Sequence, residues 1–180
     1  PTAGSCGILP AVMYVVANSK GSSRDAVIRA FFTAAGFGII IARNASISGA
    51  EGGCQAECGS ASCMAAAAAV ELAGGTPNQA AHAGAIALKN VLGLVCDPVA
   101  GLVEVPCIKR NAMAAANAMV AADLALAGIE SKIPIDEVIT AMREIGNSMP
   151  ATLRETACGG LAVTPTARLL ERQIFDAMDN

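Results

Sequence analysis

Three of the seven cysteines in this sequence lie where a loop meets a predicted helix. Cys54 follows the glycine-rich run 47–53, Cys96 lies in a proline-containing loop, and Cys107 comes directly after Pro106. A helix N-terminus lowers the pKa of a thiol, and the thiolate is the form that binds metal. These positions suit the ligands of an iron–sulfur cluster. Spacing alone does not separate that interpretation from three buried structural cysteines, so both stand at this point.

Other uses of the cysteines have less support. The number of cysteines is odd and no secretory signal is visible, which argues against a disulfide framework. His82 is the only histidine and no pair has the C-x2-C spacing, so a zinc site is a distant third interpretation. Cys58 and Cys63 lie in an alanine-rich stretch, and we interpret them as buried structural residues.

The opening segment, from Thr2 to Gly7, consists of small residues that run into a predicted helix. Backbone amides at a helix N-terminus favour anions such as carboxylates, and the hydroxyls of Thr2 and Ser5 could add donors. On the local pattern alone, a tight turn with a capping hydroxyl is the more common explanation.

No residue is identified as a general base. His82 lies in the middle of a predicted helix among alanines, where packing is the more common role. Glu51 and Glu57 flank Cys54 and could act in a site, although capping or support of a ligand explains them equally well. Lys109 and Arg110 follow Cys107 and could bind an anion; a solvated helix face is the alternative.

Composition excludes several partners. The net charge is −3, aromatic residues make up 3% of the chain, and no stretch concentrates lysine or arginine. A nucleic-acid surface needs a basic stripe, so we expect no nucleic-acid partner. The most apolar segment, 30–42, falls short of the roughly 18 residues that a membrane span needs. We therefore expect a buried helix, no membrane partner and a cytoplasmic location.

The sequence predicts an all-α fold, in a single domain over residues 1–180 whose Gly/Pro-rich loops carry the three cysteines. Alanine is abundant and alternating β-branched runs are absent, which favours helices that pack closely through small side chains. Thr76 to Gln79 forms a capping box with proline at the first helical position, and Ser22 with Asp25 marks another start. Helices are expected over 8–20, from that second start to about 36 with a continuation to 45, and over 54–73, 77–92, 107–127, 135–149 and 165–178.

Five motifs in this sequence resemble, in order, the signatures of the iron–sulfur-dependent L-serine dehydratases. Three contain the cysteines at loop–helix junctions: EGGCQAE at 51–57, LVCDPVAG at 94–101 and VPCIKRN at 105–111. The other two are PTAGSCG at 1–7 and RETACGGL at 154–161. The likeness spans nearly the whole chain and corresponds to the α chain or α region of the family. We expect the chain to lack the N-terminal part of that region.

The resemblance implies a [4Fe–4S] cluster held by Cys54, Cys96 and Cys107, with one iron left open for substrate and no pyridoxal phosphate. The remaining cysteines, Cys6, Cys58, Cys63 and Cys158, are then not ligands. The implied activity is a lyase reaction of amino-acid catabolism and gluconeogenesis that converts L-serine to pyruvate and ammonia.

The resemblance also suggests where substrate and partners bind. Thr2, Gly4 and Ser5 are the candidate contacts for the substrate carboxylate. The chain end carries no cysteine, which suits the two-chain type with a separate β chain in an oligomer. The fragment on its own could then be inactive. Two alternatives remain: a β-eliminating lyase acting on threonine or cysteine, and a helical subunit or scaffold with buried structural cysteines.

Overall fold

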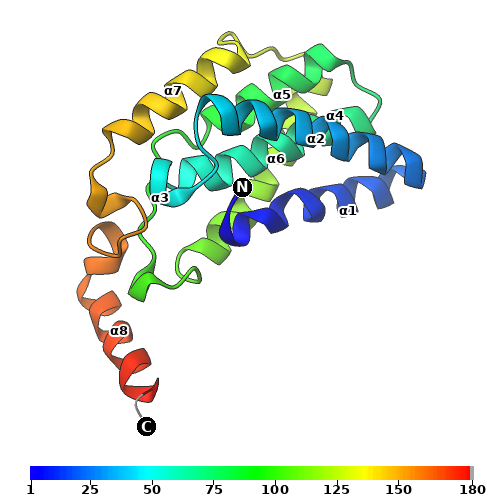
Figure 1. The fold of residues 1–180 in the computed structure, drawn as a ribbon. Coiled ribbons are helices and arrows are strands. Elements are labelled where there is room, and N and C mark those ends of the chain that lie inside the picture. The colour runs from blue at the N-terminus through cyan, green and yellow to red at the C-terminus, as the bar shows by residue number, and fades with distance from the viewer. Residues whose placement is uncertain (179–180) are drawn as a thin grey trace.

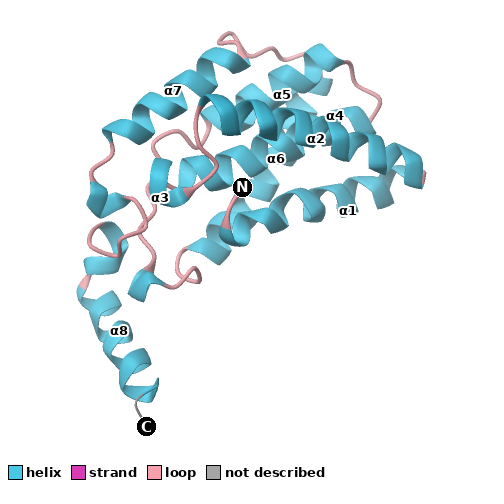
Figure 2. Ribbon diagram, viewed as in Figure 1, coloured by secondary structure: helices cyan, strands magenta, loops and turns pink. Residues whose placement is uncertain are grey.

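The computed structural model describes residues 1–178, and the regular secondary structure of this part of the chain is helical, as predicted (Figure 2). It contains eight α-helices joined by loops and by short 3-10 and π turns. No β-strand occurs between residues 1 and 178; the nearest feature is one isolated parallel bridge between Cys96 and Arg154. The expected all-α fold is confirmed.

One helix, α4 (Ser60–Leu72), forms the centre of the helical body. Four helices pack around it: α1 (Ile8–Lys20), α2 (Arg24–Asn44), α5 (Pro77–Lys89) and α6 (Cys107–Leu126) (Figure 1). A helix that is apolar on every side is stable only when neighbours cover it on every side, and almost every residue of α4 is buried.

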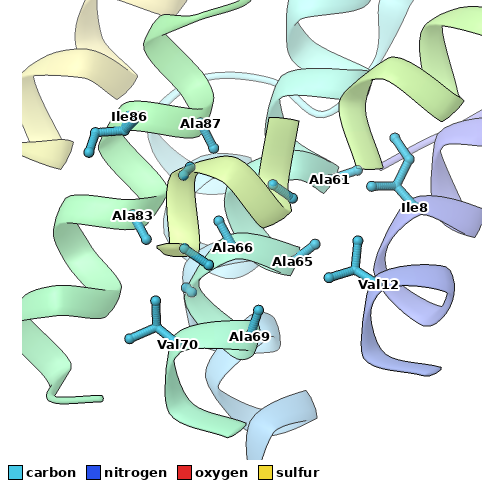
Figure 3. Packing of buried hydrophobic residues seen from close by; sticks show 14 of the residues in the cluster. Ile8, Val12, Ala61, Ala65, Ala66, Ala69, Val70, Ala83, Ile86 and Ala87 are labelled. Carbon is cyan, nitrogen blue, oxygen red and sulfur yellow. The ribbon is translucent and has the colours of Figure 1, made fainter. Parts of the chain in front are cut away.

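Small side chains set the spacing of this core. Alanines of α4 face alanines of α5 on one side and Ile8 and Val12 of α1 on the other (Figure 3). Alanine presents only a methyl group, so helix backbones can approach closely and still fill the space between them. The labelled members of the cluster are Ile8, Val12, Ala61, Ala65, Ala66, Ala69, Val70, Ala83, Ile86 and Ala87.

The predicted helix starts are largely correct. Thr76 Oγ1 accepts a hydrogen bond from the Gln79 amide, and the Thr76 amide donates one to Gln79 Oε1, so the capping box is confirmed. Gly21 ends α1 in the left-handed conformation at φ 61°. The start assigned to Ser22 is wrong by one residue, because Ser23 accepts from the Ala26 amide and caps α2.

The prediction that segment 30–42 is a buried helix is wrong. It belongs to the longer, unbroken α2, which contacts α4 through the buried Ala30, Ala34 and Ile41. Most other positions of α2 are accessible, and Phe32 is 75% exposed. By length and composition alone α2 could also cross a membrane. Apolar residues occur on both faces of this helix, so their periodicity does not show which face the rest of the protein covers.

The loops are more structured than the sequence suggested. The expected turn at 47–53 contains a short helix, α3 (Gly49–Gly52), and the expected helix from Cys54 begins with a π turn over Gln55–Gly59. The loop expected at 94–106 is ordered and includes a 3-10 turn at Val99–Gly101.

The C-terminal third matches the prediction closely. It contains α7 (Ile135–Ser148) and α8 (Pro165–Met178), with 3-10 turns at Ala151–Leu153 and Gly160–Val163 between them. Helix α8 extends away from the helical body (Figure 1).

Candidate metal centre

Two of the three predicted ligand cysteines meet in the interior. The sulfurs of Cys54 and Cys96 and a carboxylate oxygen of Glu57 all lie within 4.8 Å of one another, and all three residues are buried. The Cys96 amide donates to the Leu153 carbonyl and its carbonyl accepts from the Glu155 amide, both at 2.8 Å. Two thiol sulfurs and a carboxylate in one buried group are donors suited to a metal.

The sulfur of Cys54 is the most anionic of the group. The thiols of Cys58 and Cys96 donate hydrogen bonds to it and the Arg110 guanidinium lies beside it, so the pKa of Cys54 is lowered to about 3. The pKa values of Cys58 and Cys96 are raised, first because each shares its proton with Cys54 and second because both are buried. Of these three sulfurs, Cys54 is therefore the one that most readily carries the negative charge, and the Cys58 and Cys96 thiols favour their protonated forms.

Arg110 is held in place by a buried ion pair. Its Nη1 donates to Asp97 Oδ1 and to the Val95 carbonyl, both at 2.8 Å, and lies 3.7 Å from Cys54 Sγ. Asp97 is only 3% exposed, and its second oxygen accepts the Leu161 amide at 2.8 Å. Asp97 thus ties the loop of Cys96 to α6 and to the C-terminal turns, and it aims a positive charge at Cys54.

Cys107 lies at the edge of this group. It is the first residue of α6, as predicted, and it is partly exposed. Burial raises the pKa of Cys107 to about 11, and the negative charge on Cys54 acts in the same direction. Cys107 is absent from the tight group of Cys54, Glu57 and Cys96.

Glu57 connects the group to the chain opening. Thr2 Oγ1 donates a short hydrogen bond to Glu57 Oε1, and burial raises the pKa of the Glu57 carboxyl despite that bond. Gly49 makes this arrangement possible, since a Cβ there would lie 2.9 Å from Cys96 Sγ and 3.0 Å from Glu57 Cδ. Any larger residue at Gly49 would push the two groups apart.

The predicted substrate contacts lie next to this group, but they are engaged with the protein. Thr2 donates to Glu57, and Ser5 Oγ donates to the Thr2 carbonyl at 2.5 Å. Gly4 packs against Asn111, whose Nδ2 lies 2.7 Å from the position of a Cβ at Gly4. Their assignment as contacts for a substrate carboxylate stays a prediction, and it requires the hydroxyls to change partners.

The remaining candidates lie outside the group. The Nδ1 atom of His82 accepts from the Ser131 amide at 3.1 Å, so its ring ties α5 to the loop after α6. Cys63 is fully buried among core residues, whereas Cys6 and Cys158 are exposed. These positions agree with structural or surface roles.

Two residues of the site, Cys58 and Asp97, were not predicted from the sequence. Cys58 is buried as predicted, but its thiol points at Cys54 and lies 3.4 Å from Asn111 Oδ1. The spacing of four residues, which lets Cys54 and Cys58 share a helix face, is the sequence signal for this contact. Asp97 carried no signal beyond its place next to Cys96.

Metal affinity should rise steeply with pH. Cys54 is already a thiolate at neutral pH, whereas the raised pKa values of Cys96 and Cys107 keep both thiols protonated until a metal displaces their protons. We expect about two protons to be released per bound metal, measured as the slope of log affinity against pH in anaerobic Co²⁺ titrations. The Cys107→Ser variant should release about one. A slope near three for the parent chain would mean that Cys54 also releases a proton when the metal binds, and it would contradict the thiolate assigned to Cys54.

Comparison with known proteins points to one family. A family model described as "Serine dehydratase alpha chain" matches residues 1–162. A "Probable L-serine dehydratase, alpha chain" of Bacillus subtilis is 66% identical over 175 residues, which cover 97% of this chain and 58% of that protein. A protein of the same description in Latilactobacillus sakei is 60% identical, with 97% and 84% covered. The "L-serine dehydratase, alpha chain" of Peptoniphilus asaccharolyticus is 54% identical, with 99% and 61% covered.

Proposed function

Because this chain belongs to the serine dehydratase alpha chain family, we propose that it is the metal-binding part of an L-serine dehydratase, a lyase that converts L-serine to pyruvate and ammonia. The family resemblance stated from the five motifs is confirmed. The activity is proposed for the whole protein, since the chain spans 58% of the Bacillus subtilis relative. The observation that carries the proposal is the buried meeting of Cys54 and Cys96 beside Arg110.

The residues present fit a [4Fe–4S] cluster. Cys54 and Cys96 supply two sulfurs from one buried group, and Cys107 begins the helix that carries Arg110. An arginine beside a ligand sulfur offsets the negative charge that thiolate ligands bring, which favours retention of the cluster. We therefore propose Cys54, Cys96 and Cys107 as the ligands. When bound, the cluster supplies a Lewis acid for the substrate hydroxyl through its remaining iron.

The chain's own residues have distinct proposed tasks. Arg110, oriented by Asp97, adds to the hydrogen bonds of the Cys58 and Cys96 thiols in lowering the pKa of Cys54. Glu57 accepts the hydrogen bond of the Thr2 hydroxyl. A change of partner would free that hydroxyl for the substrate carboxylate. We propose that the base that removes the α-proton lies outside residues 1–178, because His82 is engaged with Ser131 and does not belong to the group of Cys54, Glu57 and Cys96.

The proposal extends to partners and location. The relatives are described as alpha chains, so we propose a separate β chain as partner, within an oligomer in the cytoplasm. L-Serine is the proposed substrate, because the relatives are described as L-serine dehydratases. The same chemistry would apply to L-threonine or L-cysteine, which differ from serine at the β-carbon or its leaving group.

The activity is tested on the complete chain, reconstituted anaerobically with iron and sulfide and mixed with its β chain. We expect pyruvate and ammonia in equal amounts from L-serine, and a lower kcat/KM for L-threonine and L-cysteine. D-Serine is the matched control, since it has the same atoms with the α-proton on the opposite face. A fully loaded complex that forms no pyruvate from L-serine would refute the proposed reaction.

A further inference from the structure

A cavity of about 420 Å³ lies between α3 and α7, beside the metal centre. Its polar lining consists of Arg143, Asn147, Arg154, Glu51 and Ser46. This volume lies in the range that holds small ligands in proteins. Neither Cys54 nor Cys96 nor Cys107 lines the cavity, so the proposed reaction leaves it unused.

The two arginines of this cavity lack an acidic partner within residues 1–178. Arg143 Nη1 donates only to the Asn44 carbonyl at 3.3 Å, and Arg154 Nη1 donates only to the Glu51 carbonyl at 3.4 Å. The Nε of Arg154 is buried and has no hydrogen-bond partner. Both guanidinium groups line the cavity and have donors without a protein acceptor, so the geometry favours an acceptor that enters from the cavity.

The charges of the lining indicate the kind of acceptor. Two guanidinium groups face one carboxylate, that of Glu51, and Glu51 already accepts a hydrogen bond from Ser46 Oγ at 2.5 Å. The lining therefore carries one uncompensated positive charge. Guanidinium groups bind carboxylates through paired hydrogen bonds, and the Asn147 amide can supply a further donor.

We propose that this cavity binds a small monocarboxylate anion between Arg143 and Arg154. A bound carboxylate accepts hydrogen bonds from the two guanidinium groups that line the cavity and neutralises the excess charge. The occupant would also bear on the metal centre, because the backbone of Arg154 forms the bridge with Cys96 and the Leu153 carbonyl accepts the Cys96 amide at 2.8 Å. Occupancy of the cavity would steady the segment that positions Cys96.

Ligand-observed NMR titration of the complete, cluster-free chain tests the site, with pyruvate as the probe and its uncharged methyl ester as the control ligand. We expect pyruvate to bind and methyl pyruvate not to bind. The Arg143→Gln variant should bind pyruvate about tenfold more weakly, because one charge-assisted hydrogen bond is lost. Arg29→Gln, at an exposed arginine on α2, should leave the affinity unchanged.

Arg154→Gln should weaken binding by a similar factor, but it could also disturb the segment that holds Cys96, so Arg143→Gln is the decisive variant. Equal affinities of Arg143→Gln and Arg29→Gln for pyruvate would overturn the proposal. So would equal binding of pyruvate and its methyl ester, or the absence of pyruvate binding by the parent chain. Displacement of pyruvate by phosphate at a lower concentration would overturn the assignment to a carboxylate. None of these outcomes depends on the cluster or on the serine reaction.

Discussion

Replacing Cys96 by serine in the complete chain should abolish cluster loading, from about four irons per chain in the parent to almost none. Serine is close to cysteine in size, so the packing around Leu153 and Glu155 should survive while the soft sulfur donor is lost. The measurement is iron and sulfide per chain after anaerobic reconstitution, together with the visible absorbance of the cluster.

The controls for this substitution are other cysteines of the same chain. Cys158→Ser, at an exposed position, should load about four irons. Cys58→Ala is the sharper comparison, because the Cys58 thiol lies beside Cys54 without belonging to the proposed ligand set. It should also retain the cluster. Full iron loading of Cys96→Ser would show that this cysteine is structural. Loss of iron loading in Cys58→Ala would show that Cys58 is itself a ligand, either in place of Cys107 or as a fourth.

The fold could be predicted from the sequence wherever a local signal determines the structure. The capping box at Thr76 depends on residues three positions apart, and Gly21 ends α1 because it adopts positive φ with little strain. The burial of helix α2 was predicted wrongly, because the same composition suits a helix that neighbours cover on all sides and a helix that they cover on one side only. Burial depends on what the rest of the molecule places next to a helix, and periodicity does not contain that information.

The candidate site divides in the same way. Local position marks Cys54 and Cys107 next to helix starts and Cys96 in a loop, and the family motifs contain all three. Their relative placement depends on contacts across long stretches of chain, such as the pairing of Cys96 with the segment at Arg154. No spacing rule could have placed these segments side by side. The contacts of Asp97 have the same origin, because its partners are Arg110 and the amide of Leu161.

Asp97→Ala should therefore be among the most destabilising substitutions in the chain, at about 3–5 kcal/mol. The Asp97 side chain is buried and Arg110 is largely so, and removal of the carboxylate leaves the guanidinium without its counter-charge and the Leu161 amide without its acceptor. The measurement is the free energy of unfolding from urea titration of the cluster-free chain, followed by circular dichroism. Asp123→Ala, at an exposed aspartate on α6, is the matched control and should change stability by less than about 0.5 kcal/mol.

A second variant separates the charge from the packing. Arg110→Met keeps much of the side-chain volume but removes the charge, so Asp97→Ala combined with Arg110→Met should be less destabilising than the sum of the two single changes, because no lone buried charge remains. The double variant should nevertheless lose the hydrogen bond from Arg110 to Cys54. We expect the pKa of the Cys54 thiol to rise in it, measured as a shift of the thiolate absorbance to higher pH. Additive free energies with an unchanged Cys54 titration would mean that the Asp97–Arg110 pair only fills space, and that the thiols of Cys58 and Cys96 alone hold Cys54 in its ionised form.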